Sequence, residues 1–239
     1  MIRVTERKTI QDIERIPEPQ ELYQQLINGV GYPYKNNMDF YLARDRALVS
    51  ILYLGALRIS EALPLTLQQF KYESNRIRIE SILLAKRKPG KVKYREAWLP
   101  LKGPRAAFTE LITNYIEALK KEDPNADRLF PWSLKKVQYP IRGPKGLYQN
   151  KKGEKVQRYS VRLVGTNRAW QVVKALLIDP NAEPEKKGWI TAHWLRQFGD
   201  DYLYDSWDHD LMAVSDYTKQ DARTLQLYLR KRYQKYRSA

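Results

Sequence analysis

Three short segments of the chain contain residue types that can bind and attack a phosphate. Arg58 follows an apolar stretch interrupted by Gly55, so its guanidinium is expected beside the free backbone N–H groups at the start of a new helix. His193 and Arg196 are three residues apart and therefore share one helix face, where a histidine transfers protons and an arginine neutralises phosphoryl oxygens. Tyr228 lies near the end of the sequence. A phenol, with an ordinary pKa of about 10, is a useful nucleophile only beside cations.

Each segment also has a purely structural interpretation. Arg58 would pair with Glu61, three residues later, on a solvated helix start. His193 stands beside Trp194 and would be a packed core histidine. The chain has 17 tyrosines, so a single one such as Tyr228 is more often a packing residue. Taken one at a time, the segments therefore do not establish a catalytic site.

The charge of the chain favours a polyanionic partner. Lys and Arg number 43 against 27 Asp and Glu, which gives a net charge of +16 and a pI near 9.8. Such an excess indicates nucleic acid first and an anionic membrane surface second. The chain has no apolar run close to the roughly 20 residues of a spanning helix. Its first residues also have no apolar signal-peptide core. We therefore expect a soluble intracellular protein without membrane contact, in the cytoplasm or on the nucleoid.

The composition argues against several kinds of site. With no cysteine, the chain has no disulfide framework, no Cys-ligated metal and no thiol nucleophile. The two histidines, His193 and His209, are too few for a His-rich metal site. His209 stands among acidic residues and is interpreted as part of a solvated loop. We predict neither a metal nor a cofactor.

The spacing of apolar residues predicts a mostly α fold with a small antiparallel β-sheet. Residues 75–80 alternate apolar and polar, and a turn at 86–91 joins them to a return strand at 94–101. The basic stretch 132–165 is interpreted as an insertion, or a loop over the partner, with short strands. We see no repeat and no linker, so we predict one compact domain. Helices are expected at 20–30, 37–54, 59–63, 66–70, 106–121, 167–178, 193–205, 211–217 and 224–236.

Taken together and in order, these segments resemble the tyrosine recombinase (phage integrase) family. Gly55-Ala-Leu-Arg-Ile-Ser-Glu-Ala-Leu63 is followed by a lysine-bearing hairpin, then by His193-Trp-Leu-Arg196, then by Tyr228. The second arginine and the tyrosine are 32 positions apart (228 − 196), as is typical of the family. Residues 95–101 and 129–132 also resemble the family's return strand and its Leu-Phe-Pro turn. The resemblance covers about residues 16–239.

The resemblance implies a role for each matching residue. Arg58 and Arg196 would hold the nonbridging oxygens of the scissile phosphate, and His193 would contact the same phosphate and assist proton transfer. Tyr228 would attack the phosphorus, which forms a 3′-phosphotyrosyl bond and frees a 5′ hydroxyl. Positioning and charge stabilisation are the main requirements of phosphoryl transfer, so arginine and lysine suffice without a metal ion.

The resemblance also implies roles for residues around this set. Lys86 would be the general acid that protonates the leaving 5′ oxygen, although Lys88 and Lys91 are in the same loop and the choice among them stays open. Glu61 resembles the family's acidic residue after the first arginine, a supporting rather than a catalytic group.

Basic residues outside this set are expected to contact DNA phosphates. The loop lysines Lys88 and Lys91 belong to this group. The stretch 135–158 contributes its own candidates, with an ordinary solvated loop as the alternative. They are Arg142, Lys145, Lys151 and Lys152.

The sequence departs from the family in three respects: Lys219, the region before residue 16, and a tail of eleven residues (239 − 228) after Tyr228, which in the family often packs onto a neighbouring protomer. Lys219 stands nine residues before Tyr228, where the family usually has His or Trp; it would still donate to the phosphate, or it is merely a basic residue at a helix start. We expect an N-terminal arm at 1–15 and a catalytic domain at 16–239, without the helical core-binding domain that normally precedes it. A fragment of a longer protein and a minimal enzyme both fit this arrangement.

The resemblance implies a site-specific DNA recombinase or integrase of a mobile element or virus. Its partner would be double-stranded DNA, on which four protomers assemble, with a monomer in the absence of DNA. A type IB topoisomerase uses the same chemistry and is the nearest alternative. A catalytically idle DNA-binding relative is an alternative of another class, and a metal-dependent nuclease is a remote third.

Overall fold

The structure is a computed structural model. It describes residues 17–29, 31, 38–85, 93–131, 138–143, 146–149, 155–156, 158–161, 164–177, 191–226 and 229, with the backbone alone over 138–161. The expected N-terminal arm lies outside these residues. So do seven of the predicted site residues: Lys86, Lys88, Lys91, Lys145, Lys151, Lys152 and Tyr228.

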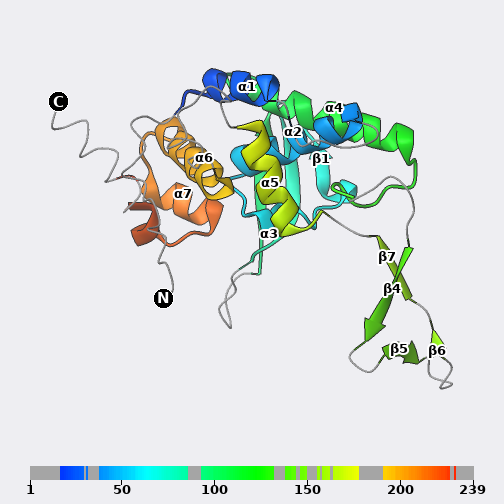
Figure 1. The fold of residues 1–239 in the computed structure, drawn as a ribbon. Coiled ribbons are helices and arrows are strands. Elements are labelled where there is room, and N and C mark those ends of the chain that lie inside the picture. Colours follow the sequence, from blue (N-terminus) through cyan, green and yellow to red (C-terminus); the bar gives the residue numbers. More distant parts are fainter. Residues whose placement is uncertain are drawn as a thin grey trace, which may run out of the picture.

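Helices make up the larger part of the described chain (Figure 1). The expected helices are present, with ends that differ by one or two residues from the predicted ones, except over 66–70. Residues 222–226 are helical, and the rest of the helix expected at 224–236 is largely outside the described residues. The helices are α1 Pro19–Asn28, α2 Met38–Leu54, α3 Ile59–Ala62, α4 Ala106–Glu122, α5 Thr166–Leu176, α6 Ala192–Ser206 and α7 Leu211–Thr218. None of the helices in the described ranges is long and apolar enough to cross a membrane.

Helix α2 forms the centre of the core. It is buried from Ala47 to Leu54, because α4, α5 and α6 all pack around it. Helix α4 presents one apolar stripe to it, with Phe108, Ile112 and Leu119 fully buried at helical spacing. A helix that is buried on nearly all sides is a rigid base, so residues that follow its end are held in fixed positions.

The first sheet is antiparallel, in the order β1-β2-β3, with β1 at Phe70–Tyr72, β2 at Arg76–Leu83 and β3 at Tyr94–Pro100. The predicted hairpin is therefore confirmed, with Ile77 opposite Leu99 and Ile79 opposite Ala97, all four side chains buried. Together with the helices it confirms the predicted fold class, mostly α with a small antiparallel sheet.

The helix predicted over residues 66–70 is wrong. Leu67–Gln69 form a single 3₁₀ turn, and Phe70 already pairs with Ile79 as the first residue of β1. The physical reason is that Phe70 packs into the core from the sheet, while the amide of Gln69 donates to the carbonyl oxygen of Glu80. These contacts hold residues 66–70 against β2 and outweigh their local preference for a helix.

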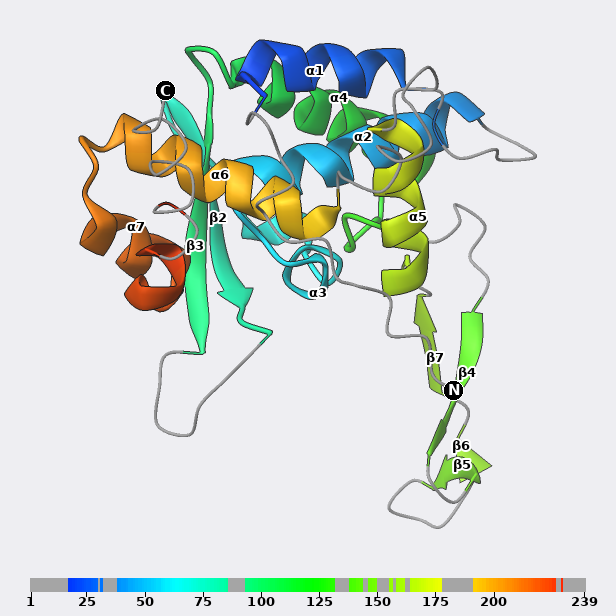
Figure 2. The ribbon, with the colours of Figure 1, turned by 60° about the vertical axis from the view of Figure 1, so that its left-hand side comes forward.

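A second sheet is formed by the basic stretch that the sequence marked as an insertion. It has four short antiparallel strands in the order β6-β5-β4-β7. Figures 1 and 2 both show it extending away from the helical body, beyond α5. Arg142 lies in β4 opposite Leu147 of β5. The bounds are β4 Gln138–Gly143, β5 Gly146–Gln149, β6 Lys155–Val156 and β7 Arg158–Val161.

Helix α7 covers the β3 edge of the first sheet. The backbone N–H of Trp98 in β3 donates to the phenol oxygen of Tyr217 at 2.6 Å, so a polar group of this edge strand is satisfied by a side chain. The rings of Trp98, Tyr217 and Trp207 pack around this bond, and burial raises the pKa of Tyr217. The side chain of Tyr217 therefore stabilises the packing of α7 against the first sheet.

Helices α2 and α6 touch backbone to backbone at Gly199. A Cβ at this position would collide with the carbonyl oxygen of Tyr53, in the last turn of α2, and would press on Ala56. Only a glycine permits this approach. Because Arg196 is one turn earlier on α6, the contact brings it to the end of α2, from which Arg58 emerges.

Replacing Gly199 with alanine tests this contact. We expect the free energy of unfolding to fall by about 1–3 kcal/mol through overpacking, although alanine is the better helix former. Equilibrium denaturation measures the change. Gly165→Ala adds the same methyl group where nothing lies within 4 Å, and it should alter stability by less than about 1 kcal/mol. Equal stability of the two variants would contradict the close approach.

Candidate active site

The sharp turn after α2 determines where Arg58 lies. The sequence predicts that Gly55 ends the helix, and α2 does end at Leu54, but the left-handed residue is Ala56, with a φ of 46°. Gly55 instead avoids a tight contact, since a Cβ there would meet Leu57 and the carbonyl oxygen of Ile51.

Two buried arginines hold the end of α2 in this conformation. Arg95 Nη2 donates to the carbonyl oxygens of Gly55 and Ala56 at 2.7 and 2.9 Å. Arg105 Nη2 donates to those of Tyr53 and Leu54 at 3.2 and 3.0 Å. Cations at a helix C-terminus satisfy carbonyl groups that have no partner within the helix and complement the helix dipole. The hydrogen bonds from Arg95 and Arg105 offset the backbone strain at Ala56, where the chain turns toward Arg58.

Arg58 stands directly before α3 and is bound to Glu61. Its backbone N–H donates to Glu61 Oε2 at 3.0 Å, and its Nη1 donates to Oε1 at 2.9 Å. The ion pair that the structural interpretation expects is therefore present. The pair is not a solvated one, however, because Glu61 is fully buried while the Arg58 side chain is 35% exposed.

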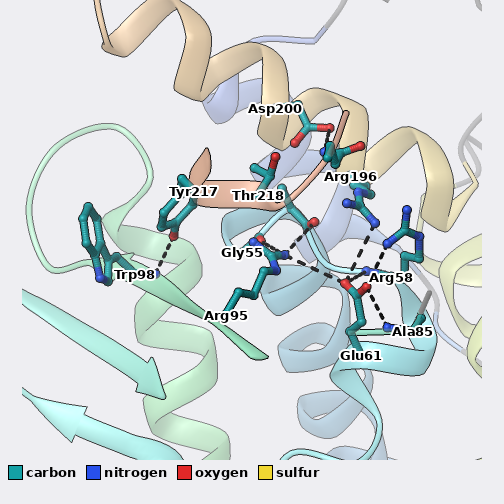
Figure 3. A network of polar contacts seen from close by, with 12 residues as sticks. Gly55, Arg58, Glu61, Ala85, Arg95, Trp98, Arg196, Asp200, Tyr217 and Thr218 are labelled. Atoms are coloured by element: carbon teal, nitrogen blue, oxygen red, sulfur yellow. Dashed lines mark hydrogen bonds and ion pairs between the residues drawn. The ribbon is translucent and has the colours of Figure 1, made fainter. Parts of the chain in front are cut away.

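Glu61 is the centre of a cluster of charges (Figure 3). Its Oε2 lies 3.9 Å from Nη2 of Arg95 and 3.9 Å from Nη1 of Arg196. Its Oε1 also accepts from the backbone N–H of Ala85, at the end of the hairpin's first strand, at 3.3 Å. One carboxylate thus joins α3, the hairpin and α6. We call Glu61 with Arg58, Arg95 and Arg196 the arginine cluster.

The charge state of Glu61 follows from these neighbours. Burial alone would raise the pKa of its carboxyl, but Arg196, the hydrogen bonds from Arg58, and Arg95 together hold the pKa below its ordinary value. The side chain is therefore ionised at neutral pH, and it offsets part of the repulsion among the three arginines.

Arg196 has the environment of an anion-binding group. The residue is 2% exposed, and burial lowers its pKa to about 10, against the opposing effects of Asp200 and Glu61. It stays charged at neutral pH. None of its three guanidinium nitrogens has a hydrogen-bond partner within the described part of the chain. Buried donors without partners are costly, and an oxyanion beside them would remove that cost.

His193 lies one turn before Arg196 on α6, as its spacing predicts. The residue is exposed, so the core interpretation does not describe it. Its Nε2 lies 3.0 Å from the amide nitrogen of Gln197. When that amide donates, Nε2 accepts, and the proton of a neutral ring is on Nδ1. His193 is thus held at the surface next to a buried arginine.

Lys219 lies at the end of α7 rather than at a helix start. It adopts the left-handed conformation, with a φ of 52°, directly after Thr218. Its ammonium group donates to Asp216 Oδ1 at 2.6 Å. The structure therefore shows Lys219 paired with an exposed carboxylate on its own helix, and its predicted contact with a phosphate stays a prediction.

Two further polar residues of this region were not among the predicted site residues. Arg95 is on the same, inward face of β3 as Ala97 and Leu99, so the strand periodicity already assigns a charge to the core side. Asp200 is one turn after Arg196 on α6, and its Oδ2 accepts from the Gln220 amide at 2.6 Å. Its only sequence signal is the i, i+4 spacing from Arg196.

The described part of this site can bind an anion. Arg58 precedes α3 and Arg196 is on α6, and Glu61 pairs with both guanidinium groups. Among the residues that the structure describes, no group of three or more His, Cys, Asp or Glu side chains is arranged to hold a metal ion. Arg142, the remaining predicted DNA contact, is in the second sheet and not in the arginine cluster.

Solved structures of XerH site-specific recombinase have a similar fold. XerH site-specific recombinase, bound to a palindromic difH substrate in a post-cleavage complex, aligns with a TM-score of 0.52 at 19% identity over 89% of this chain. Its pre-cleavage complex with difH gives 0.51. A Tn1549 transposon integrase in complex with transposon right end DNA aligns at 0.48, with 17% identity over 91% of this chain and 63% of the integrase. The chain spans about half of XerH, 48% of its length.

The sequence itself gives the family. No curated protein sequence matches the chain. The sequence model described as "Phage integrase family", in contrast, matches residues 34–235, which include every predicted catalytic residue from Arg58 to Tyr228. The resemblance seen in the motifs is therefore confirmed, and this chain belongs to the phage integrase family.

Proposed function

We propose that this chain is the catalytic domain of a site-specific DNA recombinase that cleaves and rejoins strands through Tyr228. The observation that carries the proposal is the buried guanidinium of Arg196, without hydrogen-bond partners in the described chain and joined to Arg58 through Glu61. Such a pair of arginines fits the nonbridging oxygens of a phosphodiester. Double-stranded DNA supplies that group, and XerH, which shares this fold, was solved on a DNA substrate.

In the proposed mechanism the phenol oxygen of Tyr228 attacks the scissile phosphorus. A 3′-phosphotyrosyl bond forms, and the bond from phosphorus to the 5′ oxygen breaks. Lys86 or a neighbouring loop lysine donates the proton to that oxygen, while His193 assists proton transfer at the phosphate. The 5′ hydroxyl of another strand then attacks the phosphotyrosine and releases Tyr228, so neither an external energy source nor a metal ion is needed.

Four protomers on two duplexes would carry out strand exchange, as in the rest of the family. A protein that rejoins only the strand it cut would be a topoisomerase, and one that never forms the adduct would be an idle DNA-binding relative. The phosphotyrosyl intermediate distinguishes an enzyme that cleaves DNA from a relative that only binds it, because only a nucleophile forms a covalent bond to DNA.

A nicked suicide duplex that carries the element's crossover site tests the nucleophile. In the presence of EDTA, wild type should form a denaturant-resistant protein–DNA adduct, and Tyr228→Phe should form none, because the phenol oxygen is the attacking atom. Denaturing gel electrophoresis detects the adduct. Tyr233→Phe, which lacks the 32-residue spacing, should behave as wild type. Adduct from Tyr228→Phe would assign the attack to another tyrosine, and loss of all adduct in EDTA would indicate a metal-dependent reaction.

Glu61 supports the phosphate-binding arginines in this proposal. Glu61→Gln keeps the size of the side chain but leaves three arginines close together without their counter-charge. We expect a loss of about 3–5 kcal/mol in the free energy of unfolding at pH 7, as for other broken buried ion pairs. Glu110→Gln, on the exposed face of α4, should change it by less than about 0.5 kcal/mol.

The same substitution has a pH dependence of defined sign. The folded-state pKa of Glu61 is below its ordinary value of 4.5, so its stabilisation is complete above pH 4.5 and is lost as the pH falls through the lower folded pKa. The stability difference between wild type and Glu61→Gln should therefore shrink as the pH falls below 4.5. Urea denaturation at a series of pH values measures this, and a constant difference would contradict the assigned ionisation.

The second sheet would contribute affinity for DNA. Residues 132–163 contain nine Lys or Arg and one Glu, a net charge of +8, which is half of the +16 of the whole chain. Since the sheet extends from the helical body (Figure 2), these charges can follow the duplex beyond the cleavage site. Phosphate contacts of this kind give affinity without reading the sequence.

Paired lysines test this role. Neutralising Lys151 and Lys152 with glutamine should reduce the magnitude of the negative slope of log K against log salt by about 1–2, because up to two counterions fewer are released. The loss of affinity should be equal on specific and unrelated duplexes, as measured by fluorescence anisotropy. Lys120 and Lys121, an adjacent exposed pair at the end of α4, provide the matched control. An equal effect of the control pair would show that only total charge matters.

A further inference from the structure

Asp200 joins the helix of Arg196 to the segment that precedes Tyr228. It is fully buried within the protein, one turn after Arg196 on α6. Its Oδ2 accepts from Nε2 of Gln220 at 2.6 Å, across a sequence separation of 20 residues. Gln220 follows the end of α7 and stands eight residues before Tyr228 (228 − 220). Figure 3 shows Asp200 on α6 above Arg196.

The surroundings of Asp200 make this contact a costly one to build. Its second oxygen, Oδ1, has no hydrogen-bond partner among the described residues. A buried carboxylate with one unsatisfied oxygen loses hydration that a single hydrogen bond does not replace. A position that needed only a packed side chain would be better served by an apolar residue. The role of Asp200 therefore depends on the negative charge of its carboxylate or on the ability of Oδ2 to accept a hydrogen bond.

Asp200 also acts on Arg196 through space. The guanidinium of Arg196 forms no hydrogen bond to it in the described chain, yet the two charges are close enough that each affects the other's ionisation. Arg196 is thus attracted by Glu61 on one side and by Asp200 on the other. This leaves its N–H groups available for a third anion.

We propose that Asp200 is a positioning residue, which through Gln220 holds the segment leading to Tyr228 in a fixed place relative to Arg196. The inference rests on the proposed function, in which Tyr228 attacks a phosphate that Arg196 binds. An attacking oxygen must lie in line with the phosphorus, and a small displacement of either group is costly to the rate. A buried hydrogen bond between the two elements restricts that displacement.

The contact depends on pH. Burial raises the pKa of Asp200 from 3.8 to about 6, against the attraction of Arg196 on its own helix, the Gln220 hydrogen bond, Arg95 on β3 and Arg58 before α3. Glu61, the other carboxylate of the site, is ionised throughout this range. Above about pH 6 Gln220 donates to a charged acceptor, which is the stronger kind of hydrogen bond. Below it, the acceptor is neutral and the segment is held less firmly.

Four variants separate charge, hydrogen bond and packing. Asp200→Asn keeps an acceptor oxygen of nearly the same shape but removes the charge. Asp200→Leu and Gln220→Leu each remove the hydrogen bond. Asp205→Asn is the matched control, since this carboxylate is on the same helix but 41% exposed and 3.6 Å from His209.

The first measurement is hydrogen exchange of the backbone amides of residues 219–226 in the free protein. Asp200→Leu and Gln220→Leu should raise exchange in this segment about tenfold, the effect expected when a hydrogen bond to a charged group is lost. Asp205→Asn should exchange as wild type does. Asp200→Asn should be intermediate. This readout needs neither DNA nor activity, so it decides the inference even if the chain proves not to cleave DNA.

The second measurement is the rate of adduct formation on the suicide duplex as a function of pH. The ratio of the wild-type rate to the Asp200→Asn rate should rise between about pH 5 and 7, since proton transfer at His193 is common to both proteins and cancels, whereas the ratio of wild type to Asp205→Asn should stay constant. At pH 7.5, Asp200→Leu and Gln220→Leu should each lower the rate about tenfold, and the double variant should lower it no further. DNA affinity should be nearly unchanged.

The inference and the proposed function fail in different ways. Unchanged exchange at 219–226 in both leucine variants would overturn the inference, as would additive rate losses or a ratio of wild-type to Asp200→Asn rates that is constant between about pH 5 and 7. Absence of any adduct from wild type would overturn the proposed function and leave the exchange result standing. If a leucine variant does not fold, the pH profile of Asp200→Asn decides the question.

Discussion

The site depends on one buried carboxylate. Three arginines, from segments that are 37 and 101 positions apart in the chain (58 to 95 and 95 to 196), converge on Glu61. Guanidinium groups this close together in a poorly hydrated interior repel one another strongly unless an anion lies among them. Glu61 supplies that anion and takes hydrogen bonds from Arg58 and Ala85 as well. Where Asp200 is ionised, the cluster with both carboxylates has a net charge of +1, which a single phosphodiester neutralises.

The surrounding fold keeps these charges at fixed positions. Arg95 and Arg105 cap the carbonyl groups at the end of α2, so the strained residue Ala56 and the turn to Arg58 are held from outside the helix. Gly199 lets α6 approach the same helix end without a side chain between them. Strain of this kind persists only where neighbours over-determine the conformation. The same packing that stabilises the core therefore also sets the distance between Arg58 and Arg196, the two arginines of the proposed phosphate site.

The sequence predicted the elements whose signals are local. Helical spacing identified the α-helices, alternation identified the β2–β3 hairpin, and family motifs identified Arg58, Glu61 and Arg196. The three-residue strand β1 was missed because its only cause is pairing with β2 and the burial of Phe70. Arg95 and Asp200 were missed because their roles come from residues 40 and 20 positions away, Gly55 and Gln220. Such roles arise from burial and convergence, and spacing along one element does not contain them.

The positive charge of the chain falls into two groups with different physics. In the proposed function, the lysines of residues 132–163 and the exposed cations of the helical body would interact with DNA through water, over distances at which salt screens them, with a Debye length of about 10 Å at 0.1 M. Glu61, Arg95 and Arg196 of the arginine cluster are buried and are screened far less. Exposed charge would therefore determine how much DNA is bound at a given ionic strength, because that binding depends on released counterions. Buried charge would orient the one phosphate that reacts. The proposed reaction needs both, since orientation has no effect on a duplex that is not bound, and binding along the backbone does not select a phosphorus.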